Sequence, residues 1–152
     1  MELCASRRSG GSTLAHHYSV LICEDDIGVR EAEVEHFAIA GFKVIEAING
    51  KEAVQKCSLQ KFDLVVMDMN MPRMQGDEAI VLIRAETMNR DTPIVVLSAC
   101  LDRTAVESLR GKVQKAFTKP INLRDLVGYA KTLVGEGEPP AEATGESGIS
   151  AE

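Results

Sequence analysis

The segment 63–76 constrains the fold of this chain more than any other. Its apolar run 64–67 ends at Asp68 and gives way to a loop containing Pro72 and Gly76. Because the run has no polar alternation, it predicts a strand buried on both faces, as in parallel sheets. Open sheets of this kind gather their functional groups just beyond the carboxyl ends of the strands. The sequence therefore places Asp68 where a reactive carboxylate is expected.

The composition is that of a globular protein with one domain. The chain has 152 residues, of which 45% are hydrophobic and 26% are charged, which suits one sizeable core but not two ordinary domains. The net charge of -6 argues against a protein that grips nucleic acid by its phosphates, which requires a basic face. No apolar run approaches the roughly 18 residues of a membrane helix. We therefore expect a cytoplasmic protein that binds neither nucleic acid nor membrane.

The cysteines form no metal-binding or disulfide pattern. Cys4, Cys23, Cys57 and Cys100 lie far apart, with no Cys-x-x-Cys pair among them. This spacing argues against a structural zinc site and indicates free thiols in a reducing compartment.

Apolar runs alternate with segments of helical periodicity along most of the chain. The predicted strands are 20–23, 43–47, 64–67, 94–97 and 115–118, and the predicted helices are 27–40, 52–59, 77–86, 103–109 and 122–133. With no hairpin turns between strands, the alternation predicts an α/β fold, a doubly wound five-stranded parallel sheet of order 2-1-3-4-5 with five helices, flavodoxin-like. We expect a disordered leader over 1–18, this domain over 19–134, and a flexible acidic tail rich in Gly, Pro and Glu over 135–152.

Local signals refine these predicted elements. The first helix carries apolar residues at helical spacing, which are Val29, Ala32, Phe37 and Ala40. Gly41 follows as a residue that ends helices with a positive φ. Asn49 and Gly50 predict a turn, and Asn122 predicts the N-cap of the last helix.

Carboxylates follow two strands that the predicted sheet makes neighbours. Glu24, Asp25 and Asp26 come directly after the first strand, and Asp68 comes after the third. Like charges a few ångströms apart repel, and each raises the pKa of the other. A hard divalent cation with oxygen ligands resolves this conflict, and Mg²⁺ in proteins typically takes one or two carboxylates. The coincidence of the two strand ends, rather than the acidic run alone, predicts a magnesium site.

Two further strand ends complete the chemistry of this edge. Ser98 follows the fourth strand and offers a hydroxyl group, and Lys119 follows the fifth and offers a positive charge. A nucleophilic carboxylate, a Mg²⁺ site, a hydroxyl and an ammonium group are the parts that handle a phosphoryl group.

Over roughly residues 19–134, the chain resembles the receiver domain of two-component response regulators, in its stand-alone, single-domain form. The matching segments are 20–26, 49–53, 63–76, 93–99 and 118–120. The resemblance implies that Asp68 accepts a phosphoryl group from a phosphohistidine, with Ser98 and Lys119 contacting the phosphoryl oxygens. It implies Mg²⁺ as cofactor, held by Glu24, Asp25, Asp68 and the backbone carbonyl of Asn70. It also implies a cis bond between Lys119 and Pro120.

The chain departs from the family at one position of the expected switch. An aromatic residue usually lies three positions before the lysine, where this chain has Ala116. Phe117 comes one residue later, so on a strand it should point to the opposite face. The helix 103–109, rich in charge and poor in apolar residues, is then the element expected to move on phosphorylation.

The resemblance implies a phosphoacceptor of a phosphorelay, not an enzyme with turnover. Its partners would be a sensor histidine kinase or a histidine phosphotransfer protein, and a downstream protein at the face formed by the helix 103–109, the strand 115–118 and the helix 122–133. One alternative is a receiver-like interaction module that is never phosphorylated. Another is a phosphatase of the haloacid-dehalogenase type, although Asn70 stands where such an enzyme needs a second carboxylate.

Overall fold

A computed structural model of the chain describes residues 17–71 and 73–135. The predicted leader and tail lie outside the described residues, apart from residues 17–18 and 135. The strands are β2 (Ser19–Cys23), β3 (Lys43–Ala47), β4 (Leu64–Asp68), β5 (Ile94–Ser98) and β6 (Lys115–Thr118). The helices are α1 (Ile27–Ile39), α2 (Gly50–Leu59), α3 (Gly76–Glu86), α4 (Arg103–Leu109) and α5 (Leu123–Leu133). None of these helices is long and apolar enough to cross a bilayer.

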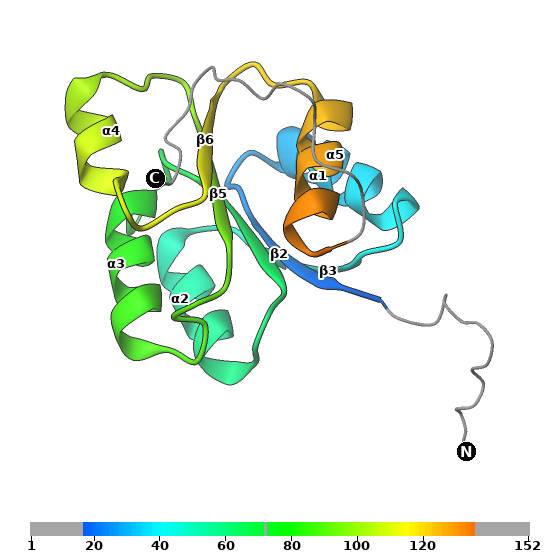
Figure 1. Cartoon of the computed structure of the whole chain (residues 1–152), viewed down its shortest axis with the longest axis horizontal. Helices are drawn as coiled ribbons and strands as arrows, with labels where there is room; N and C mark the ends of the chain where they lie inside the picture. Colours follow the sequence, from blue (N-terminus) through cyan, green and yellow to red (C-terminus); the bar gives the residue numbers. More distant parts are fainter. Residues whose placement is uncertain (1–16, 72, 136–152) are drawn as a thin grey trace.

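All the strands run parallel in one five-stranded sheet, ordered β3-β2-β4-β5-β6 (Figure 1). In chain order this is the 2-1-3-4-5 arrangement, so the predicted fold is confirmed. The order in which strands are added to the sheet reverses at β2, which pairs with β3 on one side and with β4 on the other. The carboxyl ends of β2 and β4 are therefore adjacent, and this edge of the sheet carries the predicted site.

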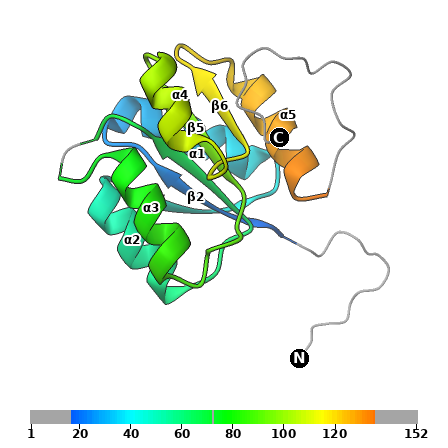
Figure 2. The same cartoon turned by 60° about the vertical axis from the view of Figure 1, so that its left-hand side comes forward.

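The helices cover both faces of the sheet and close two apolar cores. α2, α3 and α4 lie on one side, and α1 and α5 lie on the other (Figures 1 and 2). Side chains of β4 alternate between the layers, with Val65 and Met67 in the core beneath α2 and α3, and Leu64 and Val66 in the core beneath α1 and α5. Because both faces are covered, these strand residues are fully buried, which explains the apolar run without polar alternation.

Side-chain caps fix where several helices begin. Asp26 accepts a hydrogen bond from Val29 N at 3.0 Å at the start of α1. Asn122 caps α5, as predicted, and Gly41 has a φ of 101° after α1. Asn49 accepts a hydrogen bond from the backbone N–H of Glu52 at 2.8 Å, so it caps α2 instead of forming a free turn. The helix consequently begins at Gly50, two residues before the predicted start.

The predicted stripe of α1 is partly wrong. Phe37 is fully buried, but Val29 is 40% exposed. Glu33, four residues after Val29 and four before Phe37, is only 1% exposed. A carboxylate thus occupies a position on the inner face of this helix.

A polar network joins the loops at the opposite end of the sheet from Asp68. Asn89 is fully buried and donates hydrogen bonds to the carbonyls of Cys57 and Gln60 at 2.7 and 2.8 Å. Its carbonyl oxygen accepts hydrogen bonds from Phe62 N at 2.7 Å and Thr92 Oγ1 at 2.9 Å. Every polar atom of this side chain has a partner, so its burial is compensated.

Candidate functional site

Two buried carboxylates lie side by side at the carboxyl edge of the sheet. β2 and β4 pair through Cys23 and Met67, so the residues that follow, Glu24 and Asp68, are neighbours. Each is only 2% exposed, whereas Asp25 is exposed. Parallel pairing brings together residues that lie far apart in the sequence, as the carboxylate pattern predicts.

Glu24, Asp25 and Asp68 form an acidic cluster. One carboxylate oxygen from each lies within 4.8 Å of the others, and within the described part of the chain this is the group with the geometry to hold a metal ion. Burial raises the pKa of Glu24, and the negative charge of Asp68 raises it further, while Lys119 opposes both effects. The three oxygen donors are of the type and spacing that suit a hard divalent cation such as Mg²⁺.

Lys119 brings a positive charge to the two buried carboxylates. Its Nζ lies 3.1 Å from Asp68 Oδ1 and 3.3 Å from Glu24 Oε1. Burial lowers the pKa of Lys119, but the hydrogen bond and charge of Asp68, with help from Glu24, outweigh it and raise the pKa overall. The ammonium group is therefore held charged beside Asp68. The cis peptide bond between Lys119 and Pro120 agrees with the prediction.

Neighbouring groups hold the backbone around these carboxylates. Arg30 donates to the backbone carbonyl of Glu24 at 2.9 Å and to the carboxylate of Glu46 at 2.9 Å. Gly76 packs so close to the end of β4 that a Cβ there would lie 2.6 Å from the carbonyl oxygen of Asp68. The site thus has little freedom to rearrange at its base.

Ser98, the last residue of β5, and Asn70, in the loop after β4, are the other predicted site residues near Asp68. The Ser98 hydroxyl donates to the carbonyl of Cys100 at 2.9 Å and accepts from Cys100 N at 3.1 Å. The backbone N–H of Asn70 approaches Asp68 Oδ1 at 3.4 Å. In this state the Ser98 hydroxyl is engaged with its own loop rather than with Asp68 or Lys119.

The strand β6 places Ala116 and Phe117 on opposite faces of the sheet, as predicted. Ala116 is fully buried in the core on the α2, α3 and α4 side. Phe117 packs on the α5 side, with its ring centroid 5.8 Å from that of Tyr129. No aromatic ring from β6 therefore reaches the space between Ser98 and α4.

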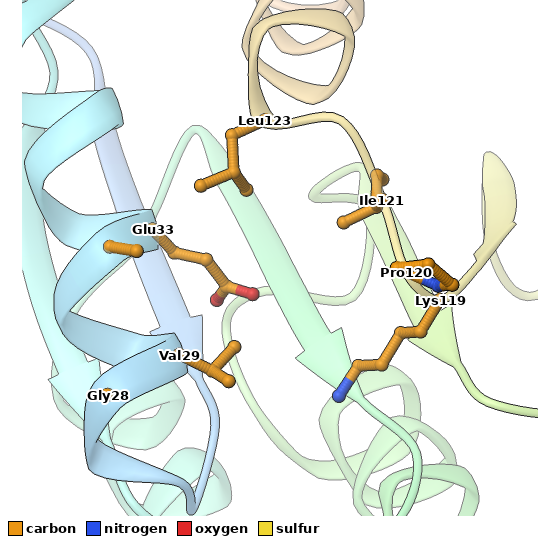
Figure 3. A pocket seen from close by; sticks show the side chains of 8 residues that line it. Gly28, Val29, Glu33, Lys119, Pro120, Ile121 and Leu123 are labelled. Carbon is orange, nitrogen blue, oxygen red and sulfur yellow. The ribbon is translucent and has the colours of Figure 1, made fainter.

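Sequence reasoning missed Glu33. Its carboxylate points from α1 into a cavity that Lys119 also lines (Figure 3). The signal that could have found it is the spacing of Val29, Glu33 and Phe37, each four residues apart and thus on one face of the helix. Burial raises the pKa of Glu33 to about 8, with a further contribution from the charge of Glu24.

Comparison with known proteins identifies a family with this fold. The model of the response regulator receiver domain matches residues 20–131. The chain is 39% identical over 110 residues to the transcriptional regulatory protein PdtaR of Mycobacterium tuberculosis, covering 71% of this chain and 52% of that protein. It thus spans about half the length of the curated relatives that it matches.

Solved structures show the same architecture. The chemotaxis protein CheY4 of Vibrio cholerae superposes with a TM-score of 0.72 at 27% identity, over 78% of this chain and 99% of that one. The receiver domain of the sensor histidine kinase PA1611 of Pseudomonas aeruginosa, described with a magnesium ion in its active-site cleft, has a TM-score of 0.71 at 22% identity, over 80% and 100% of the chains. This chain belongs to the response regulator receiver domain family.

Proposed function

We propose that Asp68 accepts a phosphoryl group from a phosphohistidine on a sensor histidine kinase or a histidine phosphotransfer protein. The observation that carries the proposal is the position of Lys119 Nζ, 3.1 Å from Asp68 Oδ1, inside the acidic cluster. A lone buried carboxylate would be a poor site for a dianionic group. Asp68 instead has a fixed cation beside it and two further carboxylates that can bind a metal.

The transfer exchanges one bond to phosphorus for another. An oxygen of Asp68 attacks phosphorus, the bond from phosphorus to the histidine nitrogen breaks, and the imidazole nitrogen leaves with the electron pair. The product is an acyl phosphate on Asp68. Negative charge spreads over the phosphoryl oxygens during such a transfer, so catalysis consists largely of positioning and charge neutralisation. The ammonium group of Lys119 supplies part of that neutralisation.

Mg²⁺ is the cation that this donor set fits. Glu24, Asp25 and Asp68 would hold it with the backbone carbonyl of Asn70, and the bound ion would neutralise charge on the phosphoryl oxygens. The magnesium ion described in the PA1611 receiver domain supports the same assignment here. Arg30 fixes the backbone carbonyl of Glu24 and so positions that ligand.

Ser98 links the phosphoryl group to the surface of the domain. To donate to a phosphoryl oxygen, its hydroxyl must leave the carbonyl of Cys100. The loop from Cys100 leads directly into α4, whose only buried residue is Leu109. A helix with so few buried contacts is free to shift, and a downstream protein would detect that shift at the face of α4, β6 and α5.

Phosphorylation is tested with Mg²⁺ and a small phosphodonor such as acetyl phosphate or phosphoramidate. Intact-protein mass spectrometry should show one added phosphoryl group on the wild type and none on Asp68→Asn. Asp91→Asn, which changes an exposed carboxylate far from the site, should be labelled like the wild type. The cognate kinase, or a panel of phosphorylated histidine kinases, serves as a second donor.

Other outcomes identify the competing functions. Steady release of inorganic phosphate at many turnovers would indicate a phosphatase, which the neutral Asn70 side chain disfavours. A protein that stays unlabelled with both kinds of donor would be a receiver-like interaction module. Label that persists in Asp68→Asn would place the phosphoacceptor elsewhere.

The output element is tested by amide hydrogen exchange with beryllium fluoride as the phosphoryl mimic. We expect exchange to change within α4 and the loop after Ser98, and to stay constant within α2. The same measurement on Asp68→Asn provides the control. Unchanged exchange in α4 of the wild type would exclude this helix as the element that signals.

A further inference from the structure

A cavity lies beside the acidic cluster, between α1 and the loop that joins β6 to α5. Its volume is about 600 Å³. Figure 3 shows Val29 and Glu33 of α1 facing Pro120, Ile121 and Leu123 across it. Pockets that hold small molecules have volumes of about 300 to 1,000 Å³ and mostly apolar walls with a few polar groups. This cavity has both properties.

The polar group inside the cavity is an unpartnered carboxylate. Neither Oε1 nor Oε2 of Glu33 has a hydrogen-bond partner, although the residue is only 1% exposed. A buried polar group without a hydrogen bond destabilises the folded state, and more so when it is charged. An apolar side chain at the position of Glu33 would not carry this cost. The presence of this carboxylate points to a ligand that supplies the missing donors.

Charged groups around the cavity do not already neutralise Glu33. Lys119 lines the same cavity, but its ammonium group binds Asp68 and Glu24 at 3.1 and 3.3 Å. The negative charges of Glu24 and Asp68 act unfavourably on a charged Glu33, and Lys119 acts favourably at longer range. The balance favours a neutral carboxyl group below about pH 8 and a carboxylate above it.

We propose that this cavity binds a compact apolar molecule that carries an amidinium or guanidinium group. Two unpartnered oxygens on one carboxylate match the two parallel N–H groups of such a planar cation, which form a bidentate pair. The apolar part of the ligand would pack between Val29 on one wall and Ile121 and Leu123 on the other. A simple ammonium group would satisfy only one oxygen well, and a carboxylate or phosphate ligand would be repelled by Glu33 once it is ionised. The proposal does not rest on the phosphoacceptor role of Asp68, although Lys119 both lines the cavity and contacts Asp68.

The test uses benzamidine as the probe and its neutral isostere benzamide as the matched control. Isotope-labelled full-length protein is titrated at about pH 9, where Glu33 is mostly ionised, and backbone amide shifts are followed by NMR. We expect saturable shifts at Val29, Glu33, Ile121 and Leu123 with benzamidine. Benzamide should bind at least tenfold more weakly, because it offers no cation to the carboxylate. Benzamidine should also bind roughly thirtyfold more weakly at about pH 6.5, where binding must first ionise Glu33.

Three variants assign the binding to this carboxylate and this cavity. Glu33→Gln keeps the size of the side chain and should weaken benzamidine binding at least tenfold. Glu35→Gln, at an exposed position of the same helix, should leave it unchanged. Ala32→Leu fills the cavity while keeping Glu33 and should also weaken binding. Thermal unfolding establishes that each variant is folded.

Contrary results are equally specific. The proposal is wrong if benzamidine gives no saturable shift at millimolar concentrations, or if benzamide binds equally well. It is also wrong if folded Glu33→Gln binds benzamidine like the wild type. Binding of an arginine-containing peptide without any binding of benzamidine would overturn it as well, and would assign the surface to a protein partner.

Discussion

Asp68 and Glu33 are both buried carboxylates in one small domain, yet their surroundings differ in one essential respect. Asp68 has the ammonium group of Lys119 at 3.1 Å and two carboxylates with which it can share a metal. Glu33 has no hydrogen-bond partner at either oxygen. Burial of a charge is tolerated only when partners compensate for the lost water. The first carboxylate therefore has a cation from the protein itself beside it. The second has no compensating partner, so it favours either a proton or a ligand.

Lys119→Gln should have the largest effect, because it removes the only protein cation that contacts Asp68 among the described residues. Loss of a group that stabilises developing charge typically lowers the rate by about 10² to 10³-fold, which is roughly 3–4 kcal/mol. We expect phosphorylation from a small donor to slow by that factor when followed by mass spectrometry. Lys61→Gln, at an exposed position, should phosphorylate at the wild-type rate. A loss below about fivefold would show that the metal alone neutralises the phosphoryl group.

Asn89→Ala tests a third case, a buried neutral side chain whose polar atoms all have hydrogen-bond partners. The change leaves the carbonyls of Cys57 and Gln60 and the amide of Phe62 without a partner. Each orphaned buried group has a cost, so we expect the free energy of unfolding to fall by about 3 kcal/mol. Urea denaturation measures this free energy of unfolding, with Gln55→Ala, at an exposed position, as the control. A loss under about 1 kcal/mol would mean that water replaces the amide.

The sequence predicted the Asp68 site because the site follows from periodicity and topology. Buried parallel strands appear as uninterrupted apolar runs, and their ends, at Glu24, Asp68, Ser98 and Lys119, are visible without coordinates. The start of α2 was less predictable. Asn49 and Gly50 resemble a turn, but Asn49 caps the helix. The tertiary contact shows why the first residue is glycine, since a Cβ at Gly50 would collide with the carbonyl oxygen of Met74.

Glu33 illustrates the limit of sequence reasoning. A charged residue in an amphipathic helix is ordinarily assigned to the solvent side, and Glu31 and Glu35, both exposed, fit that assignment. The loop after β6 lies across the cavity from Glu33, and the order of the sheet rather than a local pattern brings this loop to α1. The hydrogen bonding of the Glu33 carboxylate depends on that arrangement, so it cannot be deduced from α1 alone.

Glu33→Gln should have the smallest effect of the three and the opposite sign. A carboxyl group whose pKa is raised from 4.5 to about 8 on folding binds more protons in the folded state than in the unfolded chain across that window. Stability from this group is therefore present below about pH 4.5 and is lost as the pH rises through about 8. The glutamine variant should match the wild type near pH 5 and exceed it by about 2 kcal/mol near pH 9, less than the full linkage value because the surroundings of the carboxylate relax when it ionises. Urea denaturation at both pH values measures the difference, with Glu35→Gln as the matched control. A constant difference across this range would mean that Glu33 titrates normally and that its burial is compensated after all.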